Sequence, residues 1–289
     1  MIMSAAISPS NPRRVDIPPA PSLAHMRVAG GITVNVENSL GRSTVTRLHE
    51  SDGYKARLVR RSDPPEMIIV NTGGGLASGD RVHQNLELGE AAAFTMTTQA
   101  AERCYRSNDG GVSHVEVQAN VANDAVLNWL PQETILFDNA RLTRSIDVAL
   151  AATARILMTE IVVFGRRAMG EQLTGGLFND RWRVRRDGKL IFAENVHLCD
   201  TAFQVMSLPA MAHGAHATLT LLLAAPDAED WLASARSVVA DAPFDCAASA
   251  WDGKLVVRGL AARPEDVRRL MQSLIPALGG PPLPRAWST

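Results

Sequence analysis

Apolar and polar residues alternate along most of the chain up to about residue 225, and this period of two is the feature that most restricts the fold. One such row covers residues 32–36, and further rows follow at residues 82–88, 115–121 and 146–150. Successive side chains of a strand point to opposite faces of a sheet, so each row predicts a half-buried strand. Gly-rich or polar segments separate the rows, which predicts a succession of strands and turns.

Two dipeptides and two amphipathic segments add detail to this pattern. The dipeptides 187–188 and 252–253 read Asp-Gly, a sequence that suits the positive φ angles of two-residue hairpin turns. One helix is expected after Pro226, and a second is expected to begin at Pro264, a favoured first helical position. Pro276 and Gly279-Gly280 are expected to end the second helix.

These elements together predict a mainly β fold. We expect layered antiparallel or mixed β-sheets with two late α-helices packed on one side. Residues 1–24 contain five prolines and are expected to form a flexible lead. Residues 25–289 are then expected to form a single β-rich domain, which is within the size range of such domains.

Composition excludes several classes of partner and setting. The 29 basic and 30 acidic residues leave a net charge of −1, which argues against a nucleic-acid partner. The longest apolar run, 219–225, is far shorter than the ~20 residues that cross a bilayer. The three cysteines, Cys104, Cys199 and Cys246, show no disulfide framework or Cys-x-x-Cys zinc pattern. We therefore expect a cytoplasmic protein without a membrane partner.

The most conspicuous local sequence is the Gly-rich segment 71–80. Gly74 and Gly79 have the spacing of a phosphate-binding P-loop, but Asp80 and Arg81 stand where that motif needs Lys and Ser or Thr. A carboxylate at that position would repel a phosphate. The segment therefore predicts a tight turn between two strands, in which glycine tolerates positive φ angles.

Catalytic and soft-metal motifs are weak in this sequence. The nucleophile motif Gly-x-Ser-x-Gly is absent. His213 and His216 are three residues apart, so on a strand they would point to opposite faces. His197 and Cys199 would share a strand face, which suits two metal ligands, but packing and a hydrogen bond explain such a pair more simply.

Three glutamates, Glu133, Glu160 and Glu194, lie within apolar, strand-like segments. Desolvating an isolated charge is costly, so each must face solvent, pair with a base or meet a metal ion. Exposure or an internal arginine pair is the simpler interpretation, and the arginines within residues 166–186 are candidate partners. The alternative is a polar path that serves a hard divalent cation through oxygen ligands.

Several separated motifs occur in a fixed order over residues 57–289. They are Asn-Thr-Gly-Gly-Gly-Leu (71–76) with Ser-Gly-Asp-Arg (78–81), Thr-Thr-Gln-Ala-Ala (97–101) leading to Tyr-Arg-Ser (105–107), Leu-Pro-Gln-Glu-Thr-Ile-Leu-Phe (130–137), Glu160 through Gly-Arg-Arg-Ala-Met-Gly-Glu (165–171), and Leu-Pro-Arg-Ala-Trp (283–287). In this order they resemble the urease accessory protein D family (UreD, called UreH in some species). Residues 102–104 depart from the family pattern, which usually has a lysine and an aliphatic residue there.

The resemblance implies a urease maturation factor, a nickel-insertion chaperone, that is not an enzyme. It implies that the chain binds the urease apoprotein and, with UreF and the GTPase UreG, supports nickel delivery to the urease active site. It also implies an internal route for nickel, on which we rank Asp80 first, followed by Glu194, Glu160 and Glu171. Their role would be transient coordination of Ni²⁺, with no tightly bound cofactor.

Simpler roles stand beside these assignments. Asp80 equally suits a turn residue that accepts backbone N–H bonds, and Glu171 suits an exposed acid after a turn. Arg285 and Trp287 are residue types common at interface hot spots, but Trp287 equally suits a C-terminal anchor against the core. The alternative function is a β-rich hydrolase that uses the Gly-rich loop and the embedded carboxylates. A nickel-storage module would need a cluster of His or Cys, which the sequence lacks.

Overall fold

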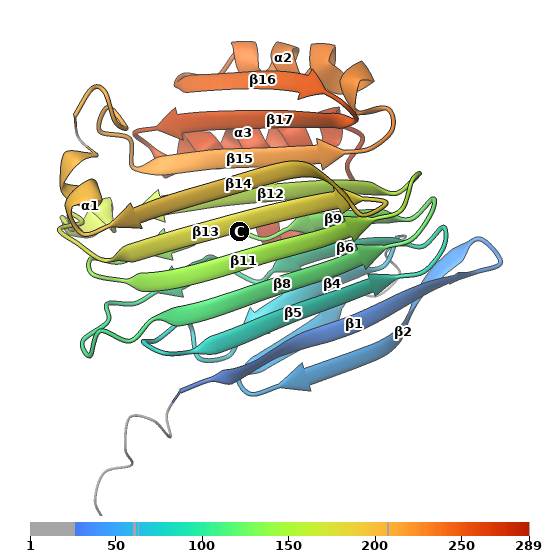
Figure 1. Cartoon of the computed structure of the whole chain (residues 1–289), viewed down its shortest axis with the longest axis horizontal. Helices are drawn as coiled ribbons and strands as arrows, with labels where there is room; N and C mark the ends of the chain where they lie inside the picture. The colour runs from blue at the N-terminus through green and yellow to red at the C-terminus, as the bar shows by residue number, and fades with distance from the viewer. Residues whose placement is uncertain (1–26, 60–61, 63, 207, 289) are drawn as a thin grey trace, which may run out of the picture.

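Two large β-sheets face each other in the computed structural model, which describes residues 27–59, 62, 64–206 and 208–288 (Figure 1). The expected lead, 1–24, lies outside these residues. One sheet has seven strands in the order β14-β13-β11-β8-β5-β1-β2. Its strands are β1 (Ala29–Ser39), β2 (Arg42–Ser51), β5 (Arg81–Leu88), β8 (Ser113–Val121), β11 (Arg141–Leu150), β13 (Leu177–Arg186) and β14 (Lys189–Cys199).

The second sheet has ten strands, eight of them in the order β16-β17-β15-β12-β9-β6-β4-β3. The two short strands β7 and β10 lie off this path, where β10 pairs with both β12 and β7. The ten strands are β3 (Tyr54–Leu58), β4 (Glu66–Asn71), β6 (Ala93–Thr98), β7 (Glu102–Cys104), β9 (Val126–Leu130), β10 (Thr134–Leu136), β12 (Arg155–Phe164), β15 (Ala217–Ala224), β16 (Asp245–Trp251) and β17 (Lys254–Ala261).

The chain crosses repeatedly from one sheet to the other between β4 and β13. Each crossing returns the chain to a sheet in the same direction, so β5, β8, β11 and β13 are parallel neighbours, and β4, β6, β9 and β12 are too. Antiparallel pairs occupy the outer parts of both sheets, such as β1–β2, β13–β14 and β15–β17. The expected strand-dominated fold with mixed sheets is confirmed.

The core lies between the sheets and follows the alternation in the sequence. On β11 the inward row, Leu142, Arg144, Ile146, Val148 and Leu150, is buried, while the residues that alternate with it are partly or fully exposed. Strand β12 differs, because every residue from Ile156 to Phe164 is buried. One face of β12 meets the opposite sheet and the other is covered by helices, so both faces of this central strand exclude water.

The two expected late helices pack on the outer face of the ten-stranded sheet, where Figure 1 shows α2 and α3 beside β15–β17. The 3₁₀ helix η3 (Ala228–Trp231) leads into α2 (Leu232–Ala240), and α3 covers Pro264–Ala277. The apolar stripe of α3 is buried against the sheet. No helix in the described part of the chain has the length and apolar character needed to span a membrane.

Two local expectations have clear outcomes, and one further element appears. Both Asp-Gly hairpins are confirmed: Asp187 and Gly188 have φ angles of 47° and 77° between β13 and β14, and residues 252–253 repeat this between β16 and β17. The expected end of the second helix is confirmed: α3 stops at Ala277, between Pro276 and Gly279, and Gly279 has a left-handed φ of 67°. The short helix α1 (Thr201–Val205) was not expected from the sequence.

Candidate functional site

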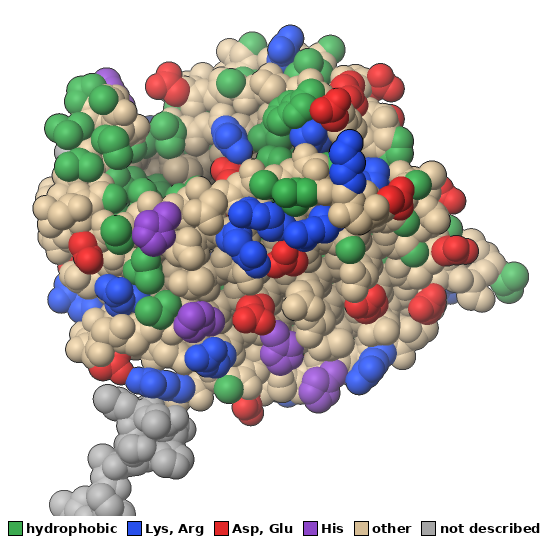
Figure 2. All heavy atoms as spheres, viewed as in Figure 1, with side chains coloured by type: hydrophobic (Ala, Val, Ile, Leu, Met, Phe, Trp, Pro, Cys, Tyr) green, Lys and Arg blue, Asp and Glu red, His purple; other side chains and the backbone are tan. Residues whose placement is uncertain are grey.

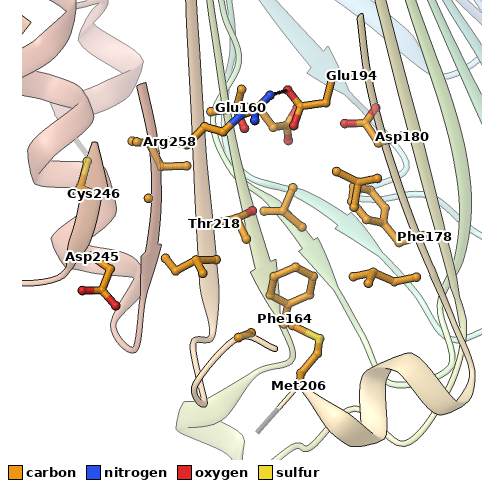
Figure 3. A pocket seen from close by; sticks show the side chains of 18 of the residues that line it. Glu160, Phe164, Phe178, Asp180, Glu194, Met206, Thr218, Asp245, Cys246 and Arg258 are labelled. Atoms are coloured by element: carbon orange, nitrogen blue, oxygen red, sulfur yellow. Dashed lines mark hydrogen bonds and ion pairs between the residues drawn. The ribbon is translucent and has the colours of Figure 1, made fainter. Parts of the chain in front are cut away.

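A cavity of about 690 Å³ opens where strand β14 of one sheet faces β12, β15 and β17 of the other (Figure 3). Much of its wall is apolar and includes Phe164, Phe178 and Met206, of which Phe164 and Met206 lie next to each other in the view. Four acidic and one basic residue line it: Glu160, Asp180, Glu194 and Arg258 lie close together, and Asp245 lies apart from them. The cavity is thus an apolar pocket with charged groups concentrated on one part of its wall, an arrangement typical of binding sites.

One buried guanidinium joins the two sheets behind this wall. Arg144 on β11 donates through Nε and Nη2 to the two carboxylate oxygens of Asp180 on β13, at 2.9 and 2.7 Å. The same Nη2 lies 2.6 Å from Oε2 of Glu160 on β12. Asp180 also accepts a hydrogen bond from Trp182 Nε1. All three charged residues are only 5% exposed, so one positive charge is shared by two carboxylates away from water.

This sharing perturbs the titration of the cluster. Burial raises the pKa of Glu160; the Arg144 guanidinium opposes this shift, while the charge of Asp180 adds to it. Burial acts to lower the pKa of Arg144, but Asp180 and Glu160 outweigh it and hold that pKa above its ordinary value. With both acids ionised, the three residues carry a net negative charge next to the cavity. That charge favours a cation or a proton there.

Glu194 reaches the same cavity from β14. Its Oε2 lies 2.8 Å from Nη2 of Arg258 on β17, and Figure 3 shows this pair close to Glu160. The Arg258 side chain is 56% exposed, so water competes for it and its pair with Glu194 is easily exchanged. The structure therefore brings together Glu160 and Glu194, two of the four predicted metal-transit residues.

Asp80 lies elsewhere, in the Gly-rich loop before β5. Its two carboxylate oxygens accept hydrogen bonds from the backbone N–H groups of Val28 and Ala77, at 2.9 and 2.7 Å. Asp80 is only 2% exposed and does not line the large cavity. This geometry is that of a residue that fixes a turn. The Gly-rich loop does not line the cavity either, so the loop and acids invoked for a hydrolase are not in one site.

Glu171 lies beside a neighbouring cavity of about 610 Å³, which shares Phe164 and Met206 with the larger one. Its carboxylate receives two charged hydrogen bonds from Arg166, at 2.9 Å each. These bonds are the main reason why the pKa of Glu171 is below its ordinary value. Glu171 is thus a paired acid next to the 3₁₀ helix η2 (Arg167–Met169).

The arginine partners of the embedded acids come from outside the segment 166–186. Glu160 pairs with Arg144, Glu194 with Arg258, and Glu133 with Arg268. The expected internal arginine pairs exist, but their expected source is wrong, because Arg181, Arg183 and Arg185 lie on the outward row of β13. Figure 2 shows Lys and Arg side chains gathered on the surface over β13 and β14. Two of the outward arginines, Arg181 and Arg185, pair with Asp147 instead.

The C-terminal motif is divided between the core and the surface. Trp287, in the 3₁₀ helix η4 (Arg285–Ser288), is 1% exposed, and its Nε1 donates to Thr97 Oγ1 and to the carbonyl of Leu130. This placement fits the anchor role. Arg285 is exposed and remains a predicted partner contact.

The histidine and cysteine pairs do not form a metal centre. His197 and Cys199 lie on the exposed face of β14, where His197 Nδ1 contacts Asn179 Oδ1 at 3.4 Å. His213 and His216 lie in the turn before β15, and all three cysteines are free. Within the described ranges, no three His, Cys, Asp or Glu side chains are placed to hold one metal ion.

Sequence reasoning missed Arg144 and Asp180, the two central members of the cluster. The signal was present in the alternation. Asp180 lies on the inward row of β13 between Phe178 and Trp182, and Arg144 lies on the inward row of β11 beside Leu142. A charged residue on an otherwise apolar row predicts a buried charge, which must have a partner.

The fold and site define a strand-dominated, two-layer protein with arginine-held acids facing an internal cavity. The family model of the UreD urease accessory protein matches residues 28–288. The chain belongs to the UreD urease accessory protein family.

Curated relatives agree along nearly the whole chain. The chain is 41% identical over 290 residues to the urease accessory protein UreD of Xanthobacter autotrophicus, covering 100% of both. It is 39% identical over 293 residues to UreD of a Methylobacterium species, covering 99% of this chain and 100% of that one. It is 41% identical over 250 residues to UreD of Rhizobium leguminosarum bv. trifolii, covering 86% and 90%. These relatives are named accessory proteins, which supports a role in urease maturation.

Proposed function

We propose that this protein is a cytoplasmic, non-enzymatic nickel-insertion chaperone. It binds the urease apoprotein and, with UreF and UreG, supports delivery of Ni²⁺ to the urease active site. Family membership supports the urease-maturation part of this proposal. The nickel part is carried by one observation, the convergence of Glu160 and Glu194 from opposite sheets on one cavity.

The chemistry of this cluster suits transit of a cation. Ni²⁺ accepts oxygen ligands, and carboxylates without thiolates or several imidazoles bind it comparatively weakly. Each acid has an arginine partner, which restores the pair when a cation leaves. Arg258 is the more easily displaced of the two, because it is exposed, whereas Arg144 is buried. A cation would thus engage Glu194 before Glu160.

Conservative variants test the route. Glu160→Gln and Glu194→Gln remove charge but keep shape, and each is co-expressed with the urease operon under limiting nickel. We expect each to lower the nickel content and activity of purified urease several-fold, while urease subunits still co-purify with the chain. The matched control is Glu116→Gln, since Glu116 is an exposed acid on β8 away from the cavity.

The same experiment covers the two other ranked acids. Asp80→Asn and Glu171→Gln belong in the series, because their place on the route is a prediction from the resemblance. Nickel loading at the wild-type rate by both the Glu160 and the Glu194 variants would overturn the transit route. Hydrolytic turnover by the isolated chain would instead support the hydrolase alternative.

A further inference from the structure

Glu102 differs from the other inward-facing glutamates because no cation neutralises it. Glu133, Glu160 and Glu194 each have an arginine within 2.8 Å. Glu102, on β7, receives neutral hydrogen bonds from Asn71 Nδ2 at 2.9 Å and from Tyr54 Oη at 3.5 Å. In the described part of the chain, no Lys, Arg or His side chain forms an ion pair with it. An uncompensated, largely desolvated carboxylate is costly, and a cationic ligand would relieve that cost.

The surroundings of Glu102 add to its negative potential. The charge of Asp80 is close enough to raise the pKa of Glu102 further, after the larger effect of burial. The same two acids, together with burial, raise the pKa of the Tyr54 phenol and of the Cys104 thiol. Glu102 and Asp80 thus both contribute negative charge to this region, which favours a positively charged ligand.

A small pocket leads from the surface to this carboxylate. It has a volume of about 220 Å³, and exposed residues of the Gly-rich loop and of segment 99–101, including Gly74 and Gln99, are on its wall. Its wall also carries the oxygen-bearing side chains of Tyr54, Asn71, Gln84, Thr98 and Glu102. Arg103 of β7 lies on the wall too, but it is exposed and forms no ion pair with Glu102. Pockets for small-molecule ligands usually have about 300–1,000 Å³, so this one suits a group the size of a side chain.

The single carboxylate and the oxygen atoms on the wall of this pocket indicate which kind of ligand it can bind. Hard divalent cations need six or more oxygen ligands and usually several carboxylates, whereas only one carboxylate lines this pocket. An ammonium or guanidinium group carries one positive charge and only hydrogen-bond donors. It matches one carboxylate surrounded by hydroxyl and amide oxygens, and charge-assisted hydrogen bonds to a carboxylate are strong.

We propose that the Glu102 pocket is a docking site for a Lys or Arg side chain presented by a protein partner. This inference extends the proposed function, since urease maturation requires association with other proteins. The lining of this pocket shares no residue with that of the large cavity, although Arg144 and Glu102 both line the small inner cavity between them. The two proposals can therefore fail separately.

Titration of the isolated chain with methylguanidinium, followed by NMR, tests the pocket directly. We expect millimolar binding with shifts around Tyr54 and Asn71, at least tenfold weaker binding in Glu102→Gln, and wild-type binding in the exposed control Glu116→Gln. Tyr54→Phe removes one hydroxyl and should weaken binding two- to fivefold. Absence of these shifts in the wild-type chain would overturn the proposal, as would Ni²⁺ binding at Glu102 without methylguanidinium binding.

The pH dependence provides a second readout. Burial raises the pKa of Glu102 to about 7, and the cation requires the ionised form. Asp80, Tyr54, Cys104 and Arg103 are the other charged or titratable groups of this region, and Arg144 lines the small inner cavity behind Glu102. Affinity should fall about tenfold from pH 8 to pH 6, as Glu102 protonates. Affinity that is independent of pH would contradict the role of Glu102.

Co-expression with the urease operon tests the protein partner. Glu102→Gln should lower the yield of co-purified urease or accessory subunits about tenfold, whereas Glu116→Gln should not. Nickel content per assembled complex should stay unchanged in Glu102→Gln, which separates this defect from a transit defect. Methylguanidinium binding combined with an unchanged yield of every subunit would overturn the assignment to a protein partner.

Discussion

At the scale of single residues, charge placement distinguishes this protein from a plain β-sandwich. Buried Arg144 is shared by Glu160 and Asp180, so its guanidinium lowers the cost of two desolvated acids at once. Removing one member of a buried ion pair leaves an uncompensated charge, which typically costs more than the pair contributes.

The variant Arg144→Ala should therefore lower the free energy of unfolding by about 3–5 kcal/mol at pH 8. The loss should be smaller at pH 6. Because the pKa of Glu160 is raised, its charge is lost as pH falls towards that pKa, and the variant then buries one charge fewer. Urea unfolding at both pH values measures the difference.

The matched control is Arg181→Ala, which breaks an exposed pair with Asp147 and should cost about 0–1 kcal/mol. Equal losses in the two variants, or a loss at Arg144 that does not change with pH, would contradict this account of the cluster.

At the scale of elements, the Gly-rich loop between β4 and β5 is shaped by close backbone contacts. A Cβ at Gly75 would lie 2.5 Å from the carbonyl oxygen of Arg103 and 2.6 Å from the Tyr105 ring. A Cβ at Gly74 would approach no atom closer than 4.0 Å, although its φ of +74° is left-handed. Substitutions at these two glycines therefore distinguish the cost of a left-handed backbone, at Gly74, from the cost of a steric clash, at Gly75.

Gly74→Ala should cost about 1 kcal/mol, the price of a left-handed residue alone. Gly75→Ala should cost on the order of 3 kcal/mol, because overpacking against the Arg103 backbone adds to the backbone strain. Thermal unfolding of both variants measures the two losses. A Gly74 variant as unstable as the Gly75 variant would show that the close contacts of Gly75 with Arg103 and Tyr105 do not determine the loop conformation.

At the scale of the whole molecule, the C-terminus fastens distant parts of the chain together. Arg268 on α3 donates to both carboxylate oxygens of Glu133, to Gln132 and to the carbonyl of Trp287. Trp287 in turn donates to Thr97 and Leu130 on the ten-stranded sheet. Sheet, helix and C-terminus therefore form one connected network.

Trp287→Ala should lower the free energy of unfolding by about 3–5 kcal/mol, because it empties a fully buried site. Arg285→Ala should change it by less than about 0.5 kcal/mol, since Arg285 is exposed. If Arg285 contacts a partner as predicted, the Arg285 variant should instead lower the yield of co-purified urease subunits. Similar effects of both changes on stability would argue against the anchor role of Trp287.

The sequence by itself determined the strands, the hairpins and the late helices. Alternation, Asp-Gly turns and the apolar stripe after Pro264 are local signals, and each depends on residues close together in the chain. The ordered motifs also determined the family. Of the cluster on the cavity wall, the sequence provided Glu160 and Glu194 as acids in apolar surroundings.

Tertiary structure decided which strands are parallel and which charges meet. The alternation of apolar and polar residues is the same in parallel and antiparallel strands. It therefore could not show that the chain crosses between the sheets and that the central strands of each sheet are parallel. Arg144 and Asp180 are 36 residues apart, and Glu194 and Arg258 are 64 apart. Such pairs form only where strands that are distant in the sequence pack together, because a charged side chain removed from water is stabilised by an opposite charge close to it in space.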